Sequence, residues 1–280
     1  ETWRDPIRIN SLEKTVVAAG TVRGAHLALG QDDRVHVAWM SAKPQASDGE
    51  RPMYYTRMKA DGSGFEAQKN VIQHAYGLDG GGTVAADHDG NVHVVWHAGE
   101  DGEASRRVYA ARSSDGGATF SREVAVSDED AGACGCCGIR AGAGSNGVGY
   151  VLYRTAREEV HRDANLIVFG KEGASYEQFL IDPWELGGCP MTTAALLPSD
   201  RGVTAAWETD GQVLFARYSE DGERKAGPFS PPGKGGFRKH PVLARNGQGE
   251  TIVVWTDGTG WWSRVASLRF VGQTYGGEGS

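Results

Sequence analysis

Four cysteines give this chain its clearest capacity for chemistry. Three of them, Cys134, Cys136 and Cys137, stand within four residues, and Cys189 follows later in a Gly-Gly-Cys-Pro segment. Thiolates select soft or borderline metals such as Cu(I) and Zn(II), and a Cys-x-Cys-Cys loop can offer two or three of them to one ion. The neighbouring glycines allow the compact backbone that such a loop needs. The spacing therefore indicates a candidate metal site.

The same four cysteines also fit disulfide bonds. An even number of cysteines in a chain that looks exported is typical of disulfides, and three pairings are open. Adjacent Cys136 and Cys137 point in different directions along an extended chain, so two such residues rarely bind one partner together. One disulfide beside a two-thiol site is the mixed solution. The residues alone leave metal binding, two disulfides and the mixed arrangement open.

The elements that must position these residues follow a repeat. A short apolar strand, a turn rich in Gly, Asp and Asn, and an alternating strand that ends in an aromatic residue recur five times. The alternation is the period-two pattern of a strand with two different faces. The aromatic ends of the five copies are Trp39, Trp96, Tyr153, Trp207 and Trp255. Five successive copies of a repeat that is made of strands are typical of a β-propeller.

A third strand follows in each copy and a weaker fourth in most, so each copy predicts one four-stranded blade. The sequence therefore predicts a single all-β domain, a five-bladed β-propeller. We expect residues 5–12, which have no blade of their own, to close the ring as a strand of the last blade. A six-bladed propeller is the alternative, if the chain contains a further copy of the repeat that is too degenerate to recognise. The expected blades span about residues 20–75, 76–130, 131–185, 186–235 and 236–275.

Composition excludes two classes of protein. Hydrophobic residues make up 39% of the 280 residues, and no stretch approaches the roughly 18 apolar residues that a membrane helix needs. The net charge is −7 and no run of Lys or Arg stands out, which argues against a nucleic-acid binder. The chain begins at Glu1 without a Met, as a processed mature protein would.

Residues 113–120, Ser-Ser-Asp-Gly-Gly-Ala-Thr-Phe, resemble the Asp-box of sialidase-like BNR-repeat propellers, Ser-x-Asp-x-Gly-x-Thr-Trp/Phe. Such a box is a turn between the third and fourth strands and carries no activity by itself. The Cys-x-Cys-Cys motif, followed by Tyr153-Arg154, Arg162-Asp163 and Gly188-Cys189-Pro190, resembles a subset of exported bacterial propellers in this superfamily. The resemblance implies a periplasmic or secreted protein, and it transfers no particular activity.

Propeller topology predicts where the cysteines lie. The loops that enter the first strands and those that leave the second strands open on one face, so all four cysteines should meet beside the channel at the mouths of two neighbouring blades. Disulfide bonds that only stabilise the fold would not require all four cysteines at the channel mouth. We therefore favour a soft metal ion over disulfides alone, with copper as the first choice and zinc as the second. Two histidines that could approach the same opening are the additional candidate ligands, His240 and His97.

The sialidase resemblance implies a different site on the same face. A sialidase clamps the substrate carboxylate with three arginines, whose bidentate and always charged side chains suit that task, and it uses a Tyr/Glu nucleophile pair. The candidates for these roles are Arg154, Arg238, Tyr153 and Glu208, with Arg23 and Arg140 on the same face. The N-terminal Phe/Tyr-Arg-Ile-Pro motif of the family is reduced to Ile-Arg-Ile-Asn at residues 7–10. We therefore rank this activity below metal binding.

Three functions follow for one exported propeller. The first is the binding of a soft metal ion through the clustered cysteines, in metal handling or redox chemistry. The second is a sialidase-like glycan hydrolase or glycan-binding protein. The third is a disulfide-stapled scaffold that binds a protein partner through the channel-mouth face. The sequence does not decide whether the chain is an enzyme.

Overall fold

The computed structural model of the chain describes residues 5–17, 23–42, 50–78, 80–145, 147–170, 175–232, 236–258 and 269–275. These residues form five antiparallel β-sheets, and their one helical element is a short 3-10 turn at Gln31–Asp33. Over the same ranges, no helix is long and apolar enough to pass through a membrane. The nearly all-β structure confirms the all-β part of the prediction.

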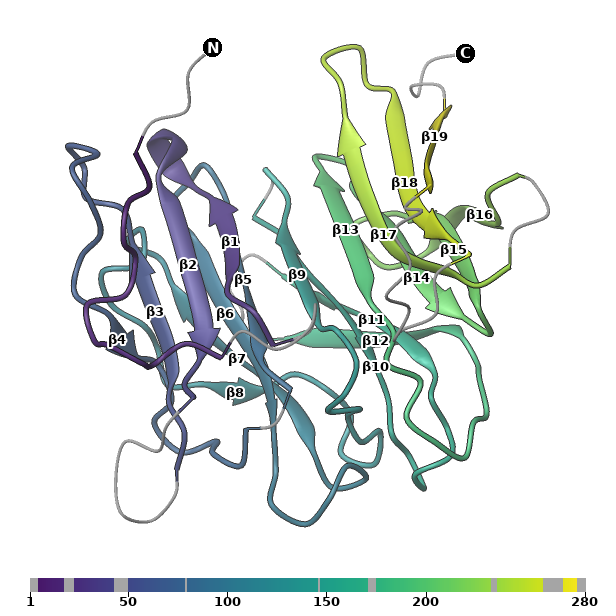
Figure 1. Ribbon diagram of the computed structural model, residues 1–280, viewed down its shortest axis with the longest axis horizontal. Coiled ribbons are helices and arrows are strands. Elements are labelled where there is room, and N and C mark those ends of the chain that lie inside the picture. The colour runs from purple at the N-terminus through teal and green to yellow at the C-terminus, as the bar shows by residue number, and fades with distance from the viewer. Residues whose placement is uncertain are drawn as a thin grey trace.

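Each sheet is made of consecutive strands, as the repeat predicts, and the sheets follow one another in chain order from purple to yellow in Figure 1. The first two sheets contain β1 (His26–Leu29), β2 (Val35–Met40), β3 (Met53–Arg57) and β4 (Lys69–Asn70), then β5 (Gly82–Ala86), β6 (Val92–Ala98), β7 (Arg107–Ser113) and β8 (Val124–Ala125). The third contains β9 (Arg140–Ala143), β10 (Gly149–Arg154), β11 (Ala164–Phe169) and β12 (Tyr176–Asp182). The fourth and fifth contain β13 (Ala194–Ser199), β14 (Gly202–Thr209), β15 (Gln212–Tyr218) and β16 (Arg224–Phe229), then β17 (Arg238–Arg245), β18 (Thr251–Asp257) and β19 (Arg269–Tyr275).

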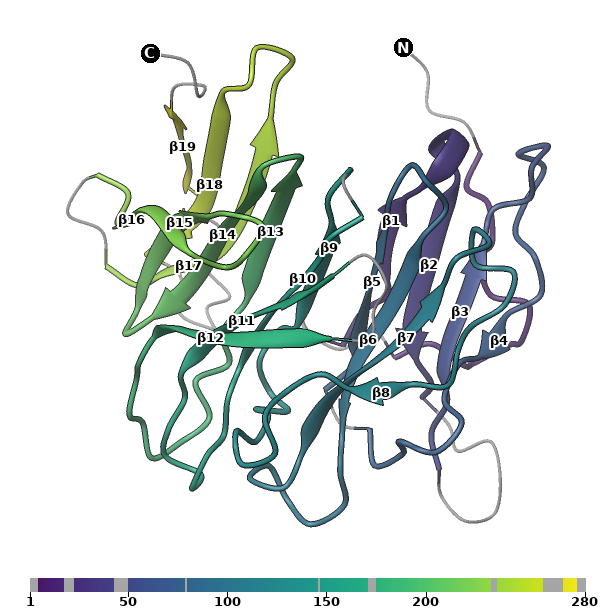
Figure 2. The ribbon, with the colours of Figure 1, turned by 180° about the vertical axis from the view of Figure 1, so that it is seen from behind.

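The first strand of every sheet reaches one central cavity of about 390 Å³. Its lining comes from β1, β5, β9, β13 and β17, so the five sheets are arranged around a common axis. Both views of the ribbon show the sheets spreading outward from these strands (Figures 1 and 2). Loops that enter the first strands are therefore brought to the axis, and the cysteines belong to two such loops.

Hydrophobic cores lie between neighbouring sheets. One cluster joins residues of the first two sheets, and others join the second to the third, the third to the fourth and the fourth to the fifth. The repeated aromatic residues are at most 3% exposed, so they pack within these cores. The indole N–H of Trp96 donates to the Ala75 carbonyl (3.0 Å), on the segment that arrives from the first sheet. Burying aromatic side chains in this way is a main source of stability.

The turn at residues 113–120 has the hydrogen bonds expected of an Asp-box. The Asp115 carboxylate accepts from the Ser113 hydroxyl (2.6 Å) and from the Thr119 amide (2.9 Å). These donors hold the pKa of Asp115 below its usual range. Lys69 of the first sheet donates to the Ala118 carbonyl (2.6 Å), so the turn also ties two sheets together.

Residues 5–12 do not form the closing strand that we predicted. They lie along the outer edge of the first sheet, where the Leu12 amide donates to the Gln68 side chain (3.2 Å) and the Gln68 amide donates to the Ser11 hydroxyl (3.3 Å). Asn10 donates its side-chain amide to the Leu12 carbonyl (2.7 Å), a local bond that competes with strand pairing. In the described residues the fifth sheet has three strands, ordered β17-β18-β19.

Candidate metal and thiol centre

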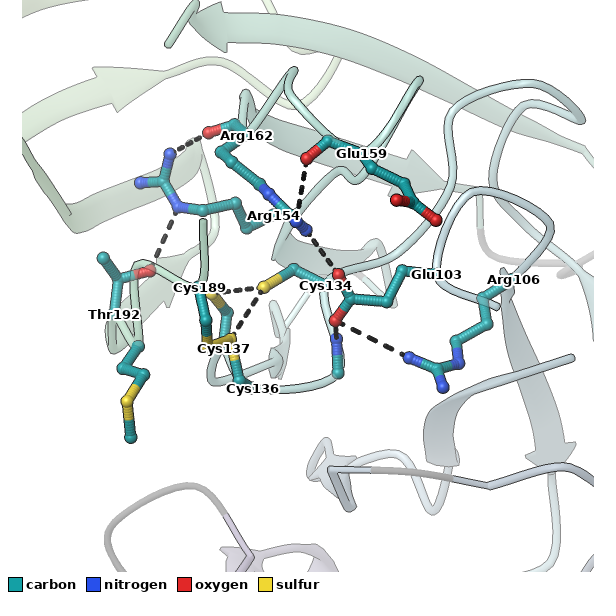
Figure 3. Close-up of a disulfide and its surroundings, with 12 residues drawn as sticks. Glu103, Arg106, Cys134, Cys136, Cys137, Arg154, Glu159, Arg162, Cys189 and Thr192 are labelled. Carbon is teal, nitrogen blue, oxygen red and sulfur yellow. Dashed lines mark hydrogen bonds and ion pairs between the residues drawn. A yellow bond between two sulfur atoms is a disulfide. The ribbon is translucent and has the colours of Figure 1, made fainter. Parts of the chain in front are cut away.

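The four cysteines meet in space, although they come from two loops (Figure 3). Cys134, Cys136 and Cys137 lie on the loop that enters β9, and Cys189 lies on the segment that enters β13. Cys136 and Cys189 form a disulfide with a Cα–Cα distance of 6.5 Å. Cys134 and Cys137 are free thiols. The structure thus has the mixed arrangement, and it brings together the four cysteines among the six residues that the sequence proposed as metal ligands.

The two thiols touch each other and lie next to the disulfide. The Cys134 sulfur is 2.7 Å from that of Cys137 and 3.3 Å from that of Cys136, and the three sulfurs lie within 4.8 Å of one another. Cys134 and Cys137 are each 2% exposed, whereas Cys136 is half-buried and Cys189 is exposed. The disulfide therefore lies between the buried thiols and the solvent.

Backbone hydrogen bonds fix the cysteine loop against the third and fourth sheets. The Cys134 amide donates to the Arg154 carbonyl (2.9 Å) at the end of β10, and the Gly138 amide donates to the Thr192 carbonyl (2.8 Å) just before β13. The cysteine loop also requires a glycine at position 80, because the loop backbone packs directly against it. Gly80 has φ of +92°, and a Cβ atom there would lie 1.8 Å from the Gly135 carbonyl oxygen.

A carboxylate holds the other side of the loop. Glu103 accepts a hydrogen bond from the Gly135 amide (3.0 Å) and an ion-pair hydrogen bond from Arg162 (2.7 Å), and Arg106 is 3.7 Å away. Arg162 also donates to the Glu159 carbonyl (3.0 Å), as Figure 3 shows. This network joins the β6–β7 loop and the β10–β11 loop around Cys134.

The two thiols share their protons unequally. Burial raises the pKa of Cys137, but the Cys134 hydrogen bond, the charge of Arg154 and contacts with Thr192 outweigh burial and lower that pKa to about 7. The hydrogen bond to Cys137, together with burial, raises the pKa of Cys134. The hydrogen bond between the two sulfurs and the charge of Arg154 therefore favour a thiolate at Cys137 over one at Cys134.

The donor set suits a soft metal. Both free thiols are soft ligands, and the cations Arg154 and Arg162 lie close enough to offset the charge of two thiolates. Metal–sulfur bonds of about 2.3 Å in a tetrahedral site set two sulfurs about 3.8 Å apart. The sulfurs of Cys134 and Cys137 would therefore have to separate by about 1 Å to hold an ion.

The two histidines proposed as additional ligands lie outside this sulfur cluster. Among the described residues, the group whose ligand atoms all lie within 4.8 Å of one another contains the three loop cysteines and neither histidine. His97 is buried at the end of β6, where a Cβ atom on Gly80 would come 3.1 Å from its Cε1. His240 donates its backbone amide to Glu208 (2.7 Å). His97 thus lies near the backbone of the cysteine loop, and His240 lies with the fourth and fifth sheets.

The arginines proposed for a carboxylate clamp are buried and already engaged. Arg154 is 4% exposed and donates to the Thr192 hydroxyl (3.0 Å) and to the carbonyls of Arg162 and Glu208. Its guanidinium also stacks 5.0 Å from the centre of the Trp184 ring. Arg238 is 2% exposed and donates to the carbonyls of Pro231 and Pro232 (2.6 and 3.1 Å). Both arginines bind the protein's own backbone.

The proposed nucleophile pair is also buried. Tyr153 is 3% exposed, burial raises its pKa, and its hydroxyl donates to Gln178 (2.8 Å). Glu208 is 2% exposed and accepts from Thr193 (2.6 Å) and from Lys239 (3.2 Å). The hydrogen bonds of both residues connect neighbouring elements of the fold.

A separate polar site lies in the central cavity, where Arg140 on β9 contacts His26 on β1. The Arg140 Nη1 atom lies 2.8 Å from the His26 Nδ1 atom, and its Nε atom donates to the Ala194 carbonyl (3.1 Å). Burial and the charge of Arg140 lower the pKa of His26 to about 3. The cavity therefore holds one permanent cation beside a neutral imidazole.

Comparisons with known proteins show the fold and no more. No family model and no curated protein matches the chain. The solved structures that match it include the Hadza microbial sialidase Hz136 (TM-score 0.53, 11% identity, 83% of this chain and 52% of that chain), the polysaccharide lyase Uly1 (0.53, 9%, 85% and 55%) and a Dyadobacter fermentans protein of unknown function (0.54, 14%, 84% and 72%). The chain spans about half the length of the first two. At these identities the likeness shows a sialidase-like propeller fold.

Proposed function

We propose that this chain is an exported five-bladed propeller that holds a soft metal ion, Cu(I), between the thiolates of Cys134 and Cys137. One observation carries the proposal: two buried free thiols touch each other, and a third sulfur lies within 4.8 Å of both. With the ion bound, the protein would store it, pass it to another protein or use it to exchange electrons. Burial of the thiolates with little access for water favours retention of such an ion.

The number of available thiolates favours copper over zinc. Thiolates bind both Cu(I) and Zn(II), but Zn(II) in structural sites takes four protein ligands. With Cys136 and Cys189 joined in a disulfide, the cluster offers two thiolates. Reduction of the disulfide would offer four sulfurs and would make zinc the stronger competitor.

The test is an anaerobic titration of the purified full chain with Cu(I) in competition with a chromophoric chelator. We expect one Cu(I) per chain, and we expect Cys134→Ser or Cys137→Ser to weaken binding by at least about a hundredfold, or about 2.8 kcal/mol. Cys189→Ser is the matched control, because it leaves both proposed ligands in place and should retain binding. Wild-type affinity in Cys134→Ser and Cys137→Ser would refute the proposal.

A glycan-directed function is the second candidate. The solved structures with this fold include a sialidase and a polysaccharide lyase, and the central cavity of this chain carries a cation, Arg140. Since Arg154 and Arg238 are engaged with backbone carbonyls, Arg140 is the arginine of this set that we propose for an acidic sugar. Binding of a sialoside to the wild type that is lost in Arg140→Ala would support this function, and equal binding by both would refute it.

The third candidate is a disulfide-stapled scaffold that binds a protein partner through the channel-mouth face. The Cys136–Cys189 disulfide is such a staple, whereas Cys134 and Cys137 are free thiols, so stapling accounts for two of the four cysteines.

A further inference from the structure

The four cysteines form two pairs that differ in access to solvent. Cys134 and Cys137 have the spacing Cys-x-x-Cys and are buried, with their sulfurs 2.7 Å apart. The disulfide partner Cys189 is exposed. Cys136 belongs to the disulfide, yet it also lies 3.3 Å from the free thiol of Cys134. An inner dithiol thus touches an outer disulfide through a single sulfur.

We infer that the centre carries out an internal thiol–disulfide exchange, in which the disulfide moves from the outer pair Cys136–Cys189 to the inner pair Cys134–Cys137. A thiolate attacks a disulfide sulfur through a mixed disulfide, so a cysteine sulfur in contact with that disulfide sulfur is the geometric requirement, and its proton must pass to a neighbouring acceptor. The contact between the sulfurs of Cys134 and Cys136 meets it. Holding both groups on one short loop replaces an encounter in solution.

The exchange has two balanced steps. In the first, the sulfur of Cys134 bonds to that of Cys136 as the Cys136–Cys189 bond breaks; Cys189 leaves as a thiolate and the proton of Cys134 passes to the sulfur of Cys137. In the second, the sulfur of Cys137 bonds to that of Cys134, its proton passes to the departing Cys136 sulfur, and Cys136 leaves as a thiol. One disulfide, one thiol and one thiolate are present before and after, so no external oxidant or reductant is consumed.

The surroundings of Cys189 leave room for this change. A Cβ atom added at Gly187 or at Gly188 would meet no heavy atom within 4 Å, so open space surrounds the segment that carries Cys189. By contrast, the loop of Cys134 is held by Glu103, Arg154 and Thr192. We therefore expect the outer segment to move away after release, while the inner pair keeps its place.

This inference rests on the same centre as the proposed function but goes beyond it, because the exchange needs no metal. The exchange would convert both proposed copper ligands into a disulfide and would present two new thiols, one of them exposed, at the surface. Metal retention and disulfide position would then be alternative states of one centre. The experiment below contains no metal, so its failure and the failure of the copper proposal are distinguishable.

The experiment follows thiols in the metal-free full chain, kept anaerobic. One alkylating reagent is added to the folded protein for increasing times, a second labels the remaining thiols after unfolding in acid, and mass spectrometry of the peptides assigns both labels and the disulfides. In the wild type we expect the first label to accumulate on Cys189 while an equal amount of Cys134–Cys137 disulfide appears. In Cys134→Ser, labelling of Cys189 should fall by at least about tenfold, because the attacking sulfur is absent.

Cys137→Ser is the matched variant, since it keeps the contact between Cys134 and Cys136 and removes the sulfur that completes the second step. Because it also removes the proton acceptor of the first step, release of Cys189 should be slower than in the wild type. Its expected product has Cys189 labelled and Cys134 joined to Cys136. Two results would overturn the inference: a wild type in which Cys136–Cys189 stays the sole disulfide throughout labelling, or a Cys134→Ser variant that releases Cys189 at the wild-type rate. The wild-type time course decides the question even if a variant fails to fold.

Discussion

Substitution of Gly80 by alanine tests how the fold positions the thiol centre. Gly80 lies beneath the cysteine loop with φ of +92°, and a Cβ atom would lie 1.8 Å from the Gly135 carbonyl oxygen and 2.7 Å from its carbon. A non-glycine residue in this conformation costs about 1–3 kcal/mol. Forcing a methyl group into a packed site costs about another 1–3 kcal/mol. We therefore expect Gly80→Ala to lower the free energy of unfolding by about 2–6 kcal/mol.

The assay is equilibrium urea unfolding followed by tryptophan fluorescence, with alkylation of Cys134 and Cys137 in the folded protein as a second readout. Alkylation should become faster in Gly80→Ala, because the loop that buries both thiols must shift away from the added methyl group. Gly187→Ala is the matched control, since a Cβ atom there meets nothing within 4 Å. Stabilities of the two variants that agree within about 0.5 kcal/mol would refute the steric reasoning.

Two other substitutions test the surrounding packing. Glu103→Gln leaves the buried Arg162 without its anion and should cost about 1–3 kcal/mol in the same unfolding assay. Burial raises the pKa of Glu103, but the bonds from Arg162 and the Gly135 amide outweigh it and lower the pKa; this stabilisation is therefore present at neutral pH and is lost as the pH falls below about 4.3. Wild type should thus lose more stability than Glu103→Gln between pH 5 and pH 3, and parallel losses would contradict the assignment. Trp96→Ala should cost about 3–5 kcal/mol, against less than about 1 kcal/mol for the exposed Leu180→Ala, and similar losses in both would contradict the core assignment.

The sheets could be predicted from the sequence because each strand carries its own periodic signal. The alternation that ends at Trp39 or Trp96 marks a second strand, and the structure buries both indoles, on strands that are buried along almost their whole length. Residues 5–12 carry only a brief alternation, Ile-Arg-Ile-Asn at residues 7–10. Their prediction as a closing strand relied on the architecture alone, and local side-chain bonds at Asn10 and Ser11 hold them elsewhere.

The cysteines could be predicted to meet because propeller topology brings successive entry loops to one axis. Which cysteines pair could not be predicted, since the pairing depends on distances of a few ångströms between two loops. Glu103 was missed altogether. It precedes the cysteine loop by some thirty residues, and nothing in the local sequence marks a carboxylate that caps the Gly135 amide. Arg154 was predicted to bind a substrate carboxylate. The sequence around an arginine at a strand end does not indicate that backbone carbonyls, such as that of Glu208, will accept its hydrogen bonds.

The pair formed by Arg140 and His26 has a consequence for any solute that enters the axis of the molecule. Because the imidazole stays uncharged down to a pKa of about 3, while the guanidinium stays charged at neutral pH although burial lowers its pKa, this pair contributes the same positive charge from mildly acidic to neutral conditions. The attraction that it exerts on an anion therefore does not vary over that range. Any acidity dependence of such an encounter would have to originate in the anion itself or in groups beyond this pair.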